Sequence, residues 1–308
     1  MTPLDKVAEK GKLSLGLVFP LEAYSGSVPQ MENQVALAQQ AEEMGFKSLW
    51  FRDVPLHDPT FGDAGQMYDP FVYMTHIMNH TSHIALATGS IILPLRHPIH
   101  TLKSINSLQL LSKGRIIIGI ASGDRPIEFP AFGKDLSQKN ELFKDSFFYL
   151  KALKSSFPSH TSTNYGQINA NADLLPKSNK VNTPYLVTGH SGQTLEWIAQ
   201  HADGWLYYPR NTYFLTHMMN DWHQALESKG QPWKPFMQSL YIDLIPGTNI
   251  RPTPIHLGFR TSADNLLKHL HTIRDIGVNH VILNLKFNSL HVEETMAIIN
   301  KEIIPELE

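Results

Sequence analysis

The chain has 308 residues, 42% of them hydrophobic and 18% charged, which is the composition of a folded globular protein and excludes a disordered one. Its 26 basic and 28 acidic residues give a formal net charge of −2, so no positive field for nucleic acid or acidic membranes is expected. Cysteine is absent, which excludes disulfides, thiolate metal sites and cysteine nucleophiles. The charged segment 1–12 lacks the apolar core of a signal peptide, and no apolar run reaches about 18 residues, so we expect a cytoplasmic protein without a membrane span.

The first half of the chain alternates short apolar runs with helical patterns. The run over 13–20 is partly β-branched and ends at a proline, as a buried strand does, and 34–44 then places apolar residues on one helical face. The same alternation continues with predicted strands over 47–53, 84–90 and 115–121, and predicted helices over 71–79, 100–111 and 138–153. Four β-then-α units therefore occupy the first half.

Residues 156–183 interrupt this rhythm. They are rich in Ser, Asn, Thr and Pro and have no sustained period, which predicts an inserted loop. Beyond it the alternation resumes, with predicted strands over 184–188, 204–208, 237–245 and 280–285, and predicted helices over 194–201, 213–228, 263–276 and 292–304.

Eight alternating units are the signature of a (β/α)₈ TIM barrel, here with an insertion after the fourth unit. A typical barrel of about 250 residues leaves room for that insertion, so we expect one domain over 1–308. An open, doubly wound sheet is the alternative, because a strand count does not show closure. In both folds the ligand binds where the strands end.

The most informative strand end is the stretch Thr-Gly-His-Ser-Gly-Gln-Thr over 188–194, which holds glycines and hydroxyls but no carboxylate just before a helix. Free backbone N–H groups, with the hydroxyls of Ser191 and Thr194, can hold a phosphate there, and Gly189 and Gly192 allow it to approach closely. The alternative is that Ser191 only caps the helix.

Other strand ends supply further candidates. A flat ligand could lie against the backbone of Thr88-Gly89-Ser90, unless this glycine is a simple bulge. Arg52 and Asp53 leave an apolar strand together and could orient a ligand or transfer a proton, or could form a purely structural ion pair. Histidines in two strand-end loops are candidates for ligand contact or proton transfer: His57 and His190.

The sixteen histidines do not form a metal-binding pattern. His76 and His80 are four residues apart on a predicted helix but lack the glutamate of the zinc-protease motif, and His97 and His100 provide only two donors. We therefore predict no metal. The sequence also lacks a nucleophile elbow, a Walker loop and a dinucleotide fingerprint. A hydrolase, a P-loop protein and a Rossmann protein are therefore less favoured.

Three blocks, in order along the chain, resemble the bacterial luciferase-like flavin-dependent monooxygenases. The first is Ala-Glu-Glu-Met-Gly-Phe-Lys-Ser-Leu-Trp-Phe-Arg-Asp over 41–53. The second, over 86–133, contains Ala-Thr-Gly-Ser-Ile-Ile-Leu-Pro-Leu-Arg-His-Pro, Leu-Ser-Lys-Gly-Arg, Ile-Gly-Ile-Ala-Ser-Gly and Glu-Phe-Pro-Ala-Phe-Gly. The third runs over 186–205, from Leu-Val-Thr-Gly-His-Ser-Gly to Ala-Asp-Gly-Trp.

The resemblance implies a (β/α)₈ barrel that uses reduced FMN and dioxygen. It implies a non-proline cis peptide at Gly89-Ser90 beneath the flavin ring, and an acidic residue, Asp53, near that ring. It also implies that Ser191 and Thr194 bind the flavin phosphate. The full set of expected cofactor-binding residues is Thr88, Gly89, Ser90, Ser122, Asp124, Arg125, His190, Ser191, Gly192 and Thr194, and the catalytic candidates are Arg52, Asp53 and His57.

The sequence departs from the luciferases proper at three positions. Val54 replaces a histidine, Ala121 a reactive cysteine and Ser122 an arginine, so light emission from a long-chain aldehyde is not expected and phosphate binding must shift to other groups such as Arg125. We predict an FMN-dependent monooxygenase of a small, apolar organic substrate, served by a separate flavin reductase and assembled as a homodimer. A deazaflavin-dependent hydride-transfer enzyme and a flavin-binding protein without turnover are the alternatives.

Overall fold

The computed structural model describes residues 2–178 and 182–307 and confirms the predicted barrel. Eight parallel strands pair in a closed ring in the order β1-β2-β3-β4-β7-β8-β9-β12 and back to β1, so the open doubly wound alternative is wrong. The strands are β1 (Ser14–Val18), β2 (Ser48–Phe51), β3 (Ala85–Ile92), β4 (Ile116–Ala121), β7 (Tyr185–Thr188), β8 (Gly204–Tyr207), β9 (Phe236–Leu244) and β12 (Val278–Asn284).

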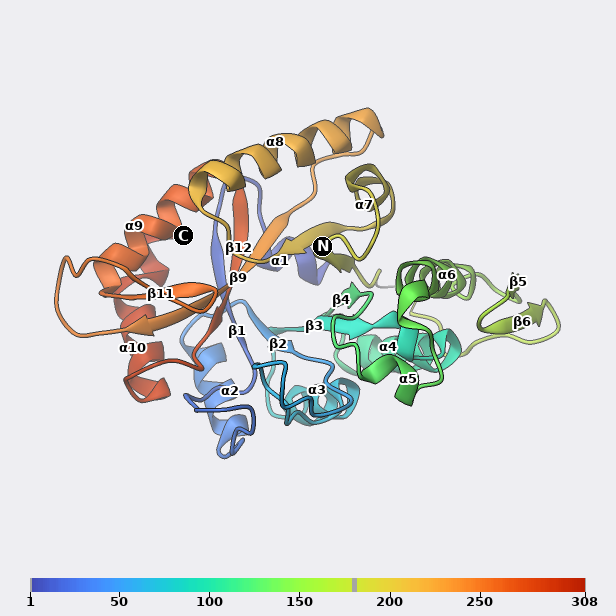
Figure 1. Ribbon diagram of the computed structural model, residues 1–308, viewed down its shortest axis with the longest axis horizontal. Helices are drawn as coiled ribbons and strands as arrows, with labels where there is room; N and C mark the ends of the chain where they lie inside the picture. The colour runs from blue at the N-terminus through green and yellow to red at the C-terminus, as the bar shows by residue number, and fades with distance from the viewer. Residues whose placement is uncertain (1, 179–181, 308) are drawn as a thin grey trace.

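Helices surround the strands, with α8 along one side of the barrel and α9 and α10 beside it (Figure 1). The helices that connect the strands are α2 (Gln34–Glu43), α3 (Pro70–Met78), α4 (Pro98–Leu111), α6 (Lys139–Ala152), α7 (Leu195–His201), α8 (Thr212–Ser228) and α9 (Ala263–Ile276), and α10 (Val292–Glu302) follows the last strand. Short turns of helix add η1 (Leu93–Leu95), α5 (Glu128–Ala131), η2 (Leu136–Gln138) and η3 (Ile304–Glu306).

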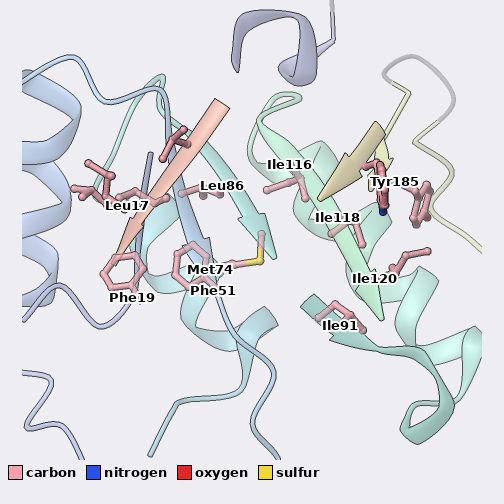
Figure 2. Packing of buried hydrophobic residues seen from close by; sticks show 14 of the residues in the cluster. Leu17, Phe19, Phe51, Met74, Leu86, Ile91, Ile116, Ile118, Ile120 and Tyr185 are labelled. Atoms are coloured by element: carbon pink, nitrogen blue, oxygen red, sulfur yellow. The ribbon is translucent and has the colours of Figure 1, made fainter. Parts of the chain in front are cut away.

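Side chains along β4 show how the core is divided. Ile116, Ile118 and Ile120 follow one another along the strand and belong to the layer between strands and helices (Figure 2). Ile117 points the other way, into the barrel, where it packs in a separate cluster with Trp50. Because side chains fill the interior of the ring, a ligand can bind only at an end of the barrel.

A short helix that the sequence did not predict, α1 (Pro3–Val7), contributes Leu4 and Val7 to the interior cluster. Its start has a capping box between Thr2 and Asp5. Five residues are too few for a helical period to be visible in a sequence.

A second missed element is the hairpin of β10 (Thr253–Ile255) and β11 (Gly258–Thr261), which extends the sheet beside β9.

The insertion is not the structureless loop that we predicted. It contains an antiparallel hairpin, β5 (Ser159–Ser162) and β6 (Gly166–Asn169), at the edge of the molecule away from β9 and β12 (Figure 1). Tyr165 at its turn is buried, and its hydroxyl donates to Pro94 O over 3.2 Å. Strands this short show no clear alternation, so the pattern could not reveal them.

Candidate functional site

Two serines meet where β4 and β7 end. The Ser122 amide donates to Ser191 Oγ over 3.2 Å, and the Ser191 hydroxyl donates to Thr188 O over 2.9 Å. Gly189, Ser191 and Gly192 all have positive φ angles, 58°, 48° and 72°, which fold residues 188–192 into a tight turn. We call this segment the serine turn. Among the described residues, no acceptor faces the amides of Ser191 and Gly192, so both remain available to a ligand.

Ser191 does not cap the following helix, so that alternative is wrong. Thr194 is the N-cap of α7, and its hydroxyl accepts the Trp197 amide over 3.2 Å. His190 is exposed and packs edge-on against Trp205, with ring centroids 5.5 Å apart. The serine turn thus keeps the hydroxyl of Ser191 and two amides at the barrel mouth.

Helix α6 brings a cation to the loop after β4, next to Ser122, which the sequence analysis missed. Lys139 is the first residue of α6, and its Nζ donates to Gly123 O over 3.2 Å, one residue past Ser122. The next residue, Asn140, packs so tightly on Gly192 that a Cβ there would overlap it. A lysine at a helix start opposes the helix dipole. That placement is the signal that could have identified Lys139.

The role of Lys139 can be tested with flavins that differ only in their phosphate. We expect Lys139→Met to weaken FMN binding by about 1 to 2 kcal/mol and to leave riboflavin binding unchanged, because only FMN carries the phosphate that the ammonium would contact. Fluorescence titration of each flavin measures this difference. Lys144→Met, on the same helix with an exposed side chain, is the matched control. Equal losses for FMN and riboflavin would contradict a phosphate contact.

The Gly89-Ser90 peptide bond is cis, as the resemblance implies. The register of β3 on β4 shifts between Thr88 and Ile91, so this segment interrupts the regular pairing of the two strands. The hydroxyl of Ser90 shares a hydrogen bond with that of Thr188, which joins this segment to the serine turn. The Thr88 hydroxyl donates to Gly119 O over 2.8 Å and is fully buried, so it is already used within the barrel wall.

The predicted pair Arg52 and Asp53 do not contact each other. Asp53 is buried and accepts three hydrogen bonds, from the Ile92 amide (3.1 Å) and from Arg96 Nε (2.9 Å) and Nη2 (2.7 Å). Arg96 Nη2 also lies 2.8 Å from Asp69 Oδ2, so one guanidinium joins Asp53 to Asp69. Burial alone would lower the pKa of Arg96, but the two carboxylates beside it raise this pKa above its ordinary value. Arg96 lies within the second block of the resemblance, but only the fold reveals its partners.

Arg52 is held by Asp63. Its Nη1 lies 2.7 Å from both carboxylate oxygens of Asp63, and its Nη2 lies 3.4 Å from the Tyr24 hydroxyl. Although burial opposes it, the guanidinium keeps the pKa of Asp63 below its usual range. The Tyr241 hydroxyl donates to the same carboxylate over 3.4 Å. This pair anchors the segment 54–68, which we call the mouth loop, to the end of β2.

Further contacts fix the mouth loop over the barrel. His57, which is exposed, lies with Nε2 2.8 Å from Ser27 Oγ, and the Gly65 amide donates to Ser27 O over 2.6 Å. From the other side, Arg125 Nη2 donates to Ala64 O over 3.1 Å and the guanidinium lies 4.6 Å from the centre of the Phe61 ring. Arg125 therefore contacts the mouth loop, and none of these contacts joins it to the serine turn.

Glu128 lies beneath Arg125 and was not singled out from the sequence. It is fully buried, its Oε1 lies 3.8 Å from Arg125 Nη1, and neither carboxylate oxygen has a hydrogen-bond partner within the described chain. Burial raises the pKa of Glu128 to about 7, although Arg125 opposes this shift. The pKa of its neighbour Asp124 is also raised, by loss of water at the barrel mouth.

The raised pKa of Glu128 gives stability a definite pH dependence. Between its ordinary value of 4.5 and about 7, the folded protein keeps a proton that the unfolded chain has released, so the free energy of unfolding falls as pH rises through this window. We expect this fall to be about 1 to 3 kcal/mol larger in the wild type than in Glu128→Gln. Urea denaturation of both proteins across this pH range measures it. Parallel profiles would contradict the shift.

His80 and His97 contact neighbouring backbone on their own helices. His80 Nδ1 lies 2.8 Å from His76 O, and His97 is the N-cap of α4. No three His, Asp or Glu side chains in residues 2–178 and 182–307 are placed to hold a metal ion. None of the helices in that part of the chain has the length and apolar character needed to cross a membrane.

Comparison with known proteins identifies the class. Residues 14–247 match the luciferase-like monooxygenase family, so the chain belongs to this family of flavin-dependent oxidoreductases and monooxygenases. Among curated relatives, it is 29% identical over 170 residues to the alkanal monooxygenase alpha chain of the Kryptophanaron alfredi symbiont, covering 54% of this chain and 46% of that one. The corresponding chain of Photorhabdus luminescens is 26% identical over 168 residues, covering 54% and 45%. The matches span about half the length of these relatives.

Solved structures share the fold at low sequence identity. An F420-dependent secondary alcohol dehydrogenase in complex with an F420-acetone adduct superposes with a TM-score of 0.79 at 16% identity, covering 96% of this chain and 99% of that one. The oxygenating constituent of 3,6-diketocamphane monooxygenase from Pseudomonas putida, in complex with FMN, gives a TM-score of 0.78 at 13% identity, with coverage of 96% and 99%. These likenesses support the luciferase-like barrel.

Proposed function

We propose that this protein is a monooxygenase that uses reduced FMN and dioxygen to oxidise a small organic substrate. One arrangement carries the proposal: the serine turn lies beside the cis Gly89-Ser90 segment, through the hydroxyl contact between Ser90 and Thr188. A phosphate site and a flat backbone surface therefore share one end of the barrel. Family membership supports a flavin as the ligand that needs both.

The residues present fit a flavin phosphate. The amides of Ser191 and Gly192 have no acceptor in the described chain, and the Lys139 ammonium, on Gly123 O one residue past Ser122, supplies positive charge nearby. The Ser191 hydroxyl donates to Thr188 O and would have to rotate to donate to a phosphate. Such a group of donors binds an anion. Lys139 thus offers the charge that the family arginine, replaced here by Ser122, would otherwise supply.

The other residues of the mouth would position the ring and exclude water. A bound reduced flavin supplies the electrons that activate dioxygen. The mouth loop, held by Arg52–Asp63 and by Arg125 on Ala64, would shield that chemistry from solvent. Because three donors occupy the Asp53 carboxylate, the exposed His57 is the better placed of the predicted catalytic residues for proton transfer.

Titration of the apo protein with FMN, reduced FMN and a deazaflavin tests the proposal. We expect reduced FMN to be preferred, and Ser191→Ala/Thr194→Ala to weaken its binding by about 1 to 3 kcal/mol through loss of charge-assisted hydrogen bonds. Ser228→Ala removes a similar hydroxyl, one that donates to Ala225 O at the end of α8, and is the control. Preference for the deazaflavin would favour a hydride-transfer enzyme, and no flavin binding would overturn the proposal.

Turnover and assembly are tested separately. Given reduced FMN and oxygen, a monooxygenase must form an oxygenated product from an added substrate, whereas a flavin-binding protein without turnover must not. The proposal includes a separate reductase, because the sequence contains no dinucleotide-binding fingerprint. It also includes a homodimer, which sedimentation velocity would detect.

A further inference from the structure

A second feature of the barrel mouth is a cleft of 690 Å³ on the side opposite the serine turn. Residues 23–27, Pro59, Gly62 and 286–288 line it, and these belong to the loops after β1, β2 and β12. Those strands are contiguous in the barrel, whereas the serine turn follows β7, which lies across the ring from β1. The Gly89-Ser90 segment lies within β3, which stands between the two sides in the strand order, and not at the strand end where the sequence placed it. In the strand order, the cleft and the serine turn therefore lie on opposite sides of Gly89-Ser90.

One lysine distinguishes this cleft. Lys286 follows β12 and is only 5% exposed. Its Nζ donates to Gly62 O over 3.2 Å and lies 4.9 Å and 5.5 Å from the ring centres of Tyr24 and Phe287. One carbonyl and two aromatic faces leave part of its hydrogen-bonding capacity unused, since an ammonium has three donors.

The positive charge of Lys286 has no counterion within ion-pair distance among the residues that the structure describes. The nearby carboxylate of Asp63 is already paired with Arg52, whose Nη1 contacts both of its oxygens. Burial of an ammonium without a counterion is unfavourable, and it lowers the pKa of Lys286, although the charge of Asp63 opposes this shift. An acidic ligand in the cleft would reduce this cost, because it would pair with the charge.

We propose that the cleft binds the carboxylate end of the organic substrate, with Lys286 as its ion-pair partner and Tyr24 and Phe287 as apolar walls for the adjoining carbons. The inference rests on the proposed function only in treating the bound acid as the substrate. Binding of the acid itself does not require flavin. It changes the expected substrate from a purely apolar molecule to one with an apolar body and a single acidic group. Lys286 is then a specificity-determining residue.

Matched pairs of probes test the charge requirement. Hexanoate and hexanamide, and benzoate and benzamide, differ in charge but hardly in shape. We expect each carboxylate to bind the apo protein saturably and its amide to bind much more weakly, as measured by calorimetry. Lys286→Met should weaken carboxylate binding by about tenfold or more, the effect of removing one member of a desolvated charge pair, while Lys286→Arg should largely retain it. Lys268→Met, at an exposed ion pair on α9, is the control.

A structural role for Lys286 gives a different result. If its bond to Gly62 O only holds the mouth loop, Lys286→Met lowers thermal stability but leaves carboxylate affinity unchanged, which overturns the inference. Equal binding of carboxylates and amides, or no saturable binding of either carboxylate, also overturns it.

Failure of this inference can be told apart from failure of the proposed function. FMN titration of the wild-type protein tests the proposed function without any change at Lys286. Normal FMN binding without carboxylate binding rejects only the acidic substrate. Carboxylate binding without binding of any flavin rejects the flavin-dependent activity and leaves an acid-binding cleft.

Discussion

Asp53→Asn is expected to lower the free energy of unfolding by about 2 to 4 kcal/mol, the largest effect we anticipate from a side chain at the mouth. The buried carboxylate accepts hydrogen bonds from Ile92 and from two nitrogens of Arg96. An asparagine keeps one acceptor and turns an NH₂ donor toward the guanidinium, so a buried charge loses its partner. The loss of stability should be smaller than for a fully buried ion pair, because Arg96 keeps a quarter of its side chain exposed and retains its contact with Asp69.

Urea denaturation measures the change, and Asp69→Asn is its control. Asp69 contacts the same guanidinium, but its side chain is 42% exposed, and asparagine caps a helix as well as aspartate does. We expect this control to cost less than about 1 kcal/mol. A stable Asp53→Asn protein that binds flavin but has lost turnover would contradict the structural account and would indicate that Asp53 takes part in the chemistry.

Gly119→Ala is expected to destabilise the protein by at least about 3 kcal/mol and to abolish flavin binding in any protein that folds. Gly119 lies in β4 with no room for a side chain, because a Cβ would overlap the carbonyl oxygen of Thr88 in β3. The neighbour is backbone and cannot rotate away. The two strands would therefore have to separate next to Gly89 and Ser90, where the ring of a flavin is expected.

Thermal denaturation and FMN titration of Gly119→Ala test both parts of this prediction. Gly11→Ala is a suitable control, since Gly11 has a positive φ of 80° but no atom within 4 Å of the added Cβ. Its cost should be only the conformational one, about 1 to 2 kcal/mol, with normal flavin affinity. A Gly119→Ala protein as stable as the wild type would show that β3 and β4 can move apart without loss.

The sequence predicted the barrel well because its signals are local. Apolar runs bounded by Pro and Gly placed the strands of the ring within a few residues of their ends. Elements shorter than one period, such as α1 and the hairpin of β5 and β6, carry too few residues for such a signal.

Much of the site depends on contacts between distant segments, and these could not be predicted from one sequence. Arg52 and Asp53 are adjacent in the chain, yet each pairs with another residue, Asp63 or Arg96, because successive residues leave a strand in opposite directions. Lys139 reaches the loop after β4 only because α6 packs on the barrel, with Phe147 of α6 against Tyr185 of β7. Lys286 acquires its significance from Tyr24 and Gly62, which are distant in sequence, as well as from the adjacent Phe287.

The guanidinium of Arg96 joins Asp53 to Asp69, the residues that flank the mouth loop. Both ends of that loop are therefore fixed to the barrel whatever its length. Lengthening a loop whose ends are held costs little conformational entropy, about 0.6 kcal/mol for each doubling. Insertions and deletions within 54–68 can thus alter which ligands are admitted while the strands keep their stability. Ligand choice can therefore evolve in the mouth loop while the strands keep the barrel rigid, and Arg96 joins the two parts.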